Sequence, residues 1–256
     1  MTLLLRQPWF LFIAVSILLV GANLVGYKLA SSTAVNEDHH RHEHITGLRE
    51  GLFVLLALLL GFTIAMVLPR FDQRRGLVDE EAHAIDMTWL RAELLPEGQR
   101  DKSMKVIRQY VTVRHDFADQ NLGDPGSVTR NIQQTRALQE ELWSQAIEVE
   151  KQDQTAVVAA YLRALDEMIG IADKRLSAFE SRVPQEVWII ILLIAVFQSF
   201  VSGYSLRQRF WLSHIVAPVV IAVVMALIAD LDDPRTGLIR TDQGSMNRIL
   251  NQISSR

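Results

Sequence analysis

The chain has 256 residues, of which 49% are hydrophobic and 21% charged, and its mean hydropathy is +0.15. The apolar residues are clustered, so the composition argues against a soluble protein and predicts membrane and aqueous parts in one chain. The net charge of -3 excludes a strongly basic nucleic-acid binder, and the absence of cysteine excludes disulfides, thiolate metal sites and cysteine nucleophiles.

Four apolar runs are long enough to cross a bilayer as helices, because about 20 residues at 1.5 Å each cover roughly 30 Å of hydrocarbon. They are residues 8–30, 51–69, 187–204 and 211–229. A cleaved signal peptide, with Arg6 as its basic start, is the alternative for the first run, although that run is longer than a typical signal core. The runs predict an all-α membrane protein with two transmembrane hairpins, residues 1–69 and 186–230.

A polar, histidine-rich loop is predicted between the first two runs, over residues 31–50. Four of the chain's seven histidines lie in it, close to Glu37, Asp38 and Glu43. Imidazoles and carboxylates at this density can bind zinc, copper or nickel, and protonation near pH ~6.5 would change their charge. The alternative is a solvated loop without fixed ligand geometry. The candidate metal ligands are His39, His40, His42 and His44.

The region between the second and third runs, residues 70–185, is predicted to be a helical, water-soluble domain. Apolar residues recur at spacings of three and four from Leu77 to Leu90, so the second span should continue as an amphipathic helix to about Pro96. Ser127 or Asp124 is expected to cap a later helix. The further helices are predicted over residues 98–120, 127–150 and 154–182, and a tail over 231–256.

The basic residues that flank the spans predict the orientation. They are more numerous on the side that would hold both termini and the inserted domain, so this side should be cytoplasmic. Arg207 and Arg209, in the short loop before the fourth span, are evidence for the opposite orientation.

No pattern in the sequence predicts an enzyme. A nucleophile elbow and a phosphate-binding glycine loop are both missing. Glu80 and His83 have the spacing used in di-iron bundles, but the soluble helices supply no second such pair. The centres of the spans carry no charge, which lowers the probability of an ion-coupled pump and leaves a channel with an apolar constriction, or an anchor. Neck candidates in the second span are Gly61, Phe62, Thr63 and Met66.

Two blocks of the chain, residues 60–96 with their continuation at Tyr110, Val111 and Arg114, and residues 231–240, resemble a bestrophin-like domain family found in many bacterial membrane proteins. An aromatic residue is commoner in that family where this chain has Arg235. The residues that carry the resemblance are Arg75, Glu81, Ala82, Ile85, Arg91, Pro96, Tyr110, Asp232, Pro234 and Gly237.

The resemblance implies a fold and a function. Bestrophins are pentameric anion channels with four spans per subunit, a helical cytoplasmic region between spans two and three, and a pore lined by the second span. It therefore implies a homo-oligomer in a bacterial inner membrane that passes an anion such as chloride, with Asn23 added to the pore candidates. The calcium-clasp residues of bestrophins are not found, so no calcium control and no cofactor are expected. The alternative is a non-conducting scaffold or sensor whose helical domain binds a protein partner.

Overall fold

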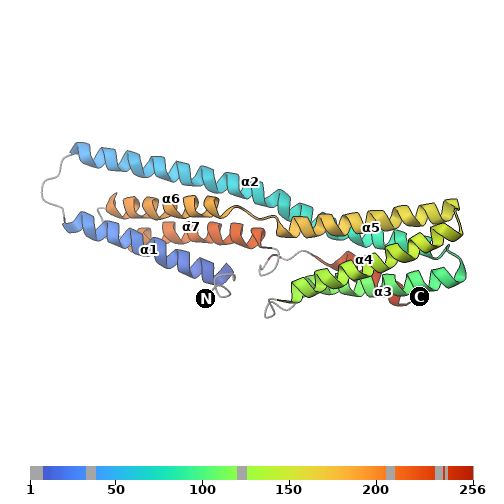
Figure 1. Ribbon diagram of the computed structural model, residues 1–256. Helices are drawn as coiled ribbons and strands as arrows, with labels where there is room; N and C mark the ends of the chain where they lie inside the picture. Colours follow the sequence, from blue (N-terminus) through green and yellow to red (C-terminus); the bar gives the residue numbers. More distant parts are fainter. Residues whose placement is uncertain are drawn as a thin grey trace. The chain divides into compact units, whose positions relative to one another are not determined.

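The computed structural model describes residues 8–32, 39–119, 126–205, 211–233 and 242–255, together with Ile239. The described residues form eight helices and no strand (Figure 1), which confirms the predicted all-α class. In chain order the helices are α1 Pro8–Ser32, α2 His39–Ala92, α3 Glu97–Asp119, α4 Ser127–Gln152, α5 Ala156–Glu180, α6 Gln185–Ser205, α7 Trp211–Asp232 and α8 Gly244–Ser254.

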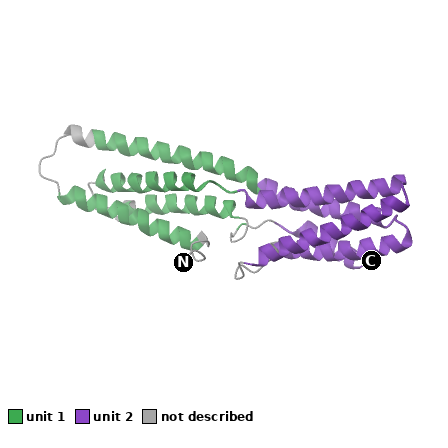
Figure 2. Ribbon diagram, in the orientation of Figure 1, with its two compact units in different colours: residues 1–71, 182–239 green, residues 72–181, 240–256 purple. Residues whose placement is uncertain are grey.

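The chain divides into two compact units (Figure 2). Unit 1 comprises residues 1–71 and 182–239, and unit 2 comprises residues 72–181 and 240–256. Helix α2 contributes residues to both units, because the division falls within it, between Phe71 and Asp72.

Unit 1 carries the apolar helices. Among the described residues, four helical stretches are long and apolar enough to cross a membrane, as the sequence predicts: they lie in α1, in α2, in the segment that contains α6, and in α7. Helix α1 packs against both α6 and α7. The core between these helices contains Leu19, Leu56, Ile191, Ala222 and Ile228, each at most 1% exposed.

Helix α2 is longer than the second span. Its 54 residues run past Pro69 to Ala92, which confirms that the span continues as an amphipathic helix. Its start at His39 corrects the predicted loop over residues 31–50, since only the first part of that segment lies outside the helix. Ile45 and Leu48 continue the apolar spacing of the span, and extending an existing helix costs far less than nucleating a new one.

Unit 2 is built from the second half of α2 with α3, α4, α5 and α8. Its core holds large side chains with no exposed area, among them Trp89, Ile107, Tyr110, Leu142 and Leu165. The N-cap of α4 is Gly126 and makes no side-chain cap bond, so the expectation that Ser127 caps this helix is wrong. Ser127 is instead its first helical residue, and Asp124 lies outside the described residues.

The C-terminal residues are not a separate tail. They form α8, whose Met246, Ile249 and Ile253 are buried in the core of unit 2. The spacing of three and four between these residues places them on one helix face, which is why the helix docks. Ser245 Oγ also donates to Asp79 of α2 at 2.6 Å.

Candidate functional site

The membrane part of α2 has two distinct faces. Leu56, Leu60, Thr63 and Val67 are at most 8% exposed, and their spacing of four, three and four residues places them on one side of the helix. Residues at positions 54, 58, 61 and 65 point the other way. On that side Val54 and Leu58 are 65% and 51% exposed. One face of the helix therefore packs within unit 1, and the other is an apolar surface.

The five pore candidates fall into different environments. Gly61 and Phe62 lie on the exposed side of α2, where Phe62 is 64% exposed. Met66 is half-buried and packs against the unit 1 core. Thr63 is buried and donates to the Leu59 carbonyl at 2.7 Å, so its hydroxyl is used within its own helix. Asn23 has no exposed area and lies between α1, α6 and α7.

Asn23 is the centre of a polar cluster inside unit 1. Its Nδ2 donates to the Ser199 carbonyl at 3.1 Å, and its Oδ1 lies 2.6 Å from Nδ1 of His214. Ser199 Oγ in turn donates to the Leu19 carbonyl at 2.7 Å. The ring of His214 also meets Tyr27 edge-on, with centroids 4.8 Å apart. Because polar groups in an apolar environment are costly unless they are hydrogen-bonded, this cluster fixes how the three helices pack.

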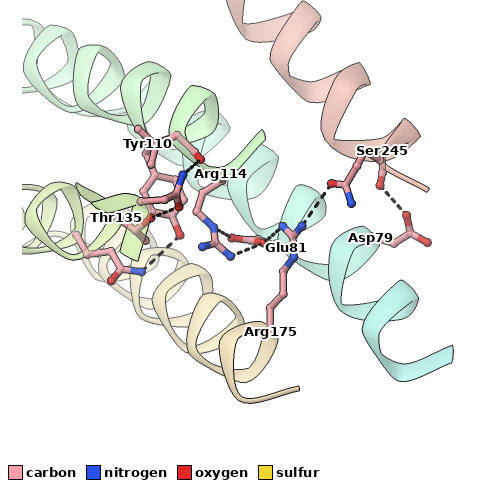
Figure 3. A network of polar contacts seen from close by, with 11 residues as sticks. Asp79, Glu81, Tyr110, Arg114, Thr135, Arg175 and Ser245 are labelled. Carbon is pink, nitrogen blue, oxygen red and sulfur yellow. Dashed lines mark hydrogen bonds and ion pairs between the residues drawn. The ribbon is translucent and has the colours of Figure 1, made fainter. Parts of the chain in front are cut away.

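Unit 2 contains a buried ion cluster formed by Glu81 of α2, Arg114 of α3 and Arg175 of α5 (Figure 3). Arg114 binds the Glu81 carboxylate through two nitrogens, with Nε 2.5 Å from Oε1 and Nη2 3.1 Å from Oε2. Arg175 Nη1 lies 2.5 Å from the same Oε2. The three side chains are at most 7% exposed. One carboxylate, on α2, thus links this helix to α3 and α5 through arginines that are far from it in sequence.

Neighbouring side chains provide further contacts for the guanidinium group of Arg175. Arg175 Nη2 donates to Gln243 Oε1 at 3.3 Å, which connects the residue before α8 to α5. The guanidinium groups of Arg114 and Arg175 lie 5.1 and 5.8 Å from the ring centroid of Phe117. Each contact is within the range of a cation–π interaction. The cluster offers no nucleophile or general base to a substrate, and its geometry serves to hold helices together.

Burial and these charges determine how the cluster titrates. Burial alone raises the pKa of Glu81, but the nearby charges of Arg114 and Arg175 and their hydrogen bonds hold that pKa below its ordinary value. Burial raises the pKa of Tyr110, and the Glu81 charge adds to this rise. Tyr110 Oη accepts a hydrogen bond from Gln139 at 3.4 Å.

The other residues of the family pattern are divided between the units. Ala82 and Ile85 are buried in the unit 2 core, whereas Arg75 and Pro96 are exposed and Arg91 is half-buried. Asp232, at the end of α7, accepts from the Val183 backbone N–H at 3.1 Å. Pro234 and Gly237 lie outside the described residues.

The candidate metal ligands are only partly described. The side chains of His39, His40 and His42 lie outside the described residues, and His44 is exposed. Among the residues that the structure describes, no group of three or more His, Asp or Glu side chains is arranged to hold a metal ion. Glu80 and His83, the residues of the di-iron spacing, are both exposed on α2.

Sequence reasoning missed the partners in both polar clusters. No local pattern links Arg175 to Glu81, which lies 94 positions away. The contact of His214 with Asn23 likewise joins residues 191 positions apart. A polar residue inside an apolar run was the available signal, since such residues usually find a partner.

Known proteins resemble this chain in sequence pattern and in fold. The sequence model of the Bestrophin-like domain family matches residues 11–246. Two point variants of a bacterial bestrophin homologue from Klebsiella pneumoniae are similar in structure. One has a TM-score of 0.66 at 14% identity, covering 98% of this chain and 96% of that chain. The other has a TM-score of 0.65 at 13% identity, covering 95% of each chain. No curated protein matches. At these identities the structural likeness shows the fold.

Proposed function

The chain belongs to the bestrophin-like family, and we propose that it is a subunit of a homo-oligomeric, anion-permeable channel. In this proposal α2 faces a central axis, several copies surround that axis, and chloride or a similar anion passes between them. The bestrophin likeness suggests five copies. The oligomer resides in a bacterial inner membrane, with unit 2 and both termini on the cytoplasmic side.

The observation that supports this assignment most directly is the two-faced packing of α2. Its buried face is satisfied within unit 1, so the opposite apolar face is free to meet copies of itself. A ring of such faces forms a narrow apolar neck, and constrictions of this kind control conduction by wetting and dewetting. Exposure alone does not separate this face from lipid-facing ones, because Leu193 of α6 is also 64% exposed. The resemblance to bestrophins, which implies that the second span lines the pore, supports α2 in this proposal.

The proposed pore lining contains fewer residues than the set of pore candidates that was predicted from the sequence. Phe62 and Gly61 form the neck, and Met66 lies beside it at the edge of the packed face. Asn23 and Thr63 stand behind the lining, because both are buried in unit 1 and use their polar groups there. Their proposed role is to hold the α2 face in position.

Chloride efflux from liposomes that contain the purified oligomer tests the proposal. Phe62→Ala shortens the side chain at the neck, so efflux should rise severalfold. Leu193→Ala is the matched control, because both side chains are 64% exposed and only one lies on α2. If the two substitutions changed chloride efflux equally, α2 would not be the helix that lines the pore. A folded oligomer that passes no anion across a range of pH and divalent metal concentrations would contradict the channel itself.

A second candidate is the non-conducting scaffold whose unit 2 binds a protein partner. One observation favours it: Trp143 and Ile147 are 39% and 40% exposed and lie four residues apart on the same face of α4. Detergent-extracted mass separates the candidates, since a monomer cannot place α2 around an axis. A monomeric mass together with specific capture of a cytoplasmic protein, abolished by Trp143→Ala, would favour the scaffold.

A further inference from the structure

Unit 1 contains a cavity of about 440 Å³ among its membrane helices. All four helices of the unit contribute to its lining, through Asn23 of α1, Arg49 and Phe53 of α2, Gln198 of α6 and Pro218 of α7. The volume is within the range of small-molecule sites, which are mostly apolar with a few fixed polar groups. This lining has that composition.

Gln198 brings to the cavity a buried acceptor, its Oε1, that has no partner among the described residues. Its side chain is 5% exposed, and its Oε1 accepts no hydrogen bond from the residues that the structure describes. The neighbouring amide of Asn23 is fully used, because Nδ2 donates to Ser199 and Oδ1 contacts His214. An unsatisfied buried acceptor costs about 1–3 kcal/mol, so a bound molecule that donates to Oε1 gains from a group that is already desolvated.

Two opposite charges line the same cavity as this acceptor. Arg49 and Glu50 both line the cavity, and their side chains are 32% and 68% exposed. The distance from Arg49 Nη2 to Glu50 Oε1 is 3.7 Å, which leaves donors and acceptors of both groups for another partner. A ligand that matches this rim carries one anionic and one cationic group close together.

Apart from Ser199 and Ser202, the rest of the lining is apolar and reaches the exposed surface of unit 1. Phe53 is 55% exposed and Ala217 is exposed as well, and Pro218 and Ile221 complete the wall. The matching molecule is therefore a zwitterion with an apolar body. An anionic ligand would be repelled by the like charge of Glu50, and a cationic ligand would be repelled by the like charge of Arg49.

We propose that the cavity binds the headgroup of a phosphoethanolamine lipid. The phosphate pairs with Arg49, and the primary ammonium donates hydrogen bonds to Glu50 and to Gln198 Oε1. The acyl chains leave the cavity past Phe53 and Ala217 into the bilayer. A trimethylated choline headgroup has the same net charge and no N–H donor, so it satisfies neither acceptor. Discrimination between the two headgroups is the signature of the site.

Native mass spectrometry of the full chain, released from micelles with matched amounts of phosphatidylethanolamine and phosphatidylcholine of identical acyl chains, measures this discrimination. The expected preference for the ethanolamine lipid is about tenfold, which corresponds to one charge-assisted hydrogen bond. Gln198→Leu and Glu50→Gln should each reduce the preference severalfold while retaining choline-lipid binding. Glu186→Gln removes an exposed acid of α6 outside the cavity and should leave the preference intact.

Three outcomes would overturn the proposal. Equal binding of the two lipids in the wild-type chain would show that no ammonium site exists. An unchanged preference in both Gln198→Leu and Glu50→Gln, with size-exclusion profiles like that of the wild type, would place the lipid elsewhere. Binding of free phosphoethanolamine as tight as that of the lipid would assign the cavity to a soluble zwitterion. Glu50→Gln keeps the test valid if Gln198→Leu does not fold, because Glu50 is at the exposed rim.

Discussion

Glu81 is a single carboxylate placed between two buried guanidinium groups, and its removal should leave both uncompensated. Breaking a buried ion pair by removing one partner typically costs about 3–5 kcal/mol, because the remaining charge cannot be solvated. Glu81→Gln should therefore lower the urea midpoint of unit 2, followed through the fluorescence of the buried Trp89. Glu80→Gln removes an adjacent, exposed charge and should change the midpoint little.

The same substitution should alter the response to acid. The pKa of Glu81 is lower in the folded chain than its ordinary value of 4.5, so its contribution to stability is present above that pH and is lost as the pH falls further. Glu81→Gln should make the free energy of unfolding fall less steeply between pH ~4.5 and the onset of acid unfolding. An acid limb identical to that of the wild type would mean that folding does not lower the pKa of Glu81.

Tyr110 should make the stability of the folded chain fall at alkaline pH, whereas Glu81 makes it fall at acidic pH. Its pKa is higher in the folded chain than its ordinary value of 10.0, so the folded state retains a proton that the unfolded state releases above that pH. Stability is then complete below pH ~10 and falls by up to about 1.4 kcal/mol per pH unit above it. Tyr110→Phe should reduce this alkaline loss in urea titrations. Burial also raises the pKa of Tyr161, so the loss should be reduced rather than abolished.

At the scale of helices, the contact between α1 and α6 depends on glycine. A Cβ added at Gly203 would overlap the backbone carbonyl of Asn23, and one at Gly26 would overlap the carbonyl of Phe200. Small residues at these positions let two membrane helices approach closely. Gly203→Ala should therefore lower the thermal unfolding temperature of the detergent-solubilised chain, at an expected cost of about 1–3 kcal/mol.

Gly21→Ala is the control for that substitution. Gly21 is also on α1, nothing lies near the position of an added Cβ, and alanine favours the helix by up to about 1 kcal/mol. This variant should be as stable as the wild type or more so. If both substitutions had the same effect, the close approach of α1 and α6 would not be the cause.

The helices that the sequence predicted best are those whose formation depends on local composition. The four spans follow from uninterrupted apolar runs, and the continuation of α2 follows from the spacing between Leu77 and Leu90. Helix α8 was missed because its apolar face has only Met246, Ile249, Leu250 and Ile253, too short a pattern to distinguish from a polar tail. Its stability comes from docking rather than from helix propensity.

The polar clusters could not be predicted for a different reason. Their residues are contributed by helices that are distant in sequence, and one sequence alone holds no signal of which polar side chains meet. Glu81 belonged to the recognised family pattern, and Arg114 followed it in the same block, but nothing in the pattern paired them. The buried acceptor of Gln198 was likewise visible only as an amide inside an apolar run. Pairing is a property of the packed helices, and the sequence records only the composition of each one.

At the scale of the whole molecule, the proposed orientation places the two units in different environments. The chain contains no cysteine, so single introduced cysteines report on their own positions without background. Gly47 of unit 1 and Ser144 of unit 2 are both exposed. In spheroplasts, whose inner membrane is intact, a membrane-impermeant maleimide should label Gly47→Cys. It should label Ser144→Cys only after the spheroplasts are lysed.

This experiment also decides how the arginines before the fourth span should be interpreted. Positive residues favour the cytoplasmic side most strongly in short loops, and Arg207 and Arg209 lie in such a loop. They are outnumbered by the basic residues that flank the spans on the unit 2 side, such as Arg70, Arg182 and Arg235. If Ser144→Cys were labelled in intact spheroplasts and Gly47→Cys were protected, the short loop would have determined the topology. Unit 2 would then be extracytoplasmic, and a cytoplasmic partner for its exposed α4 face would be excluded.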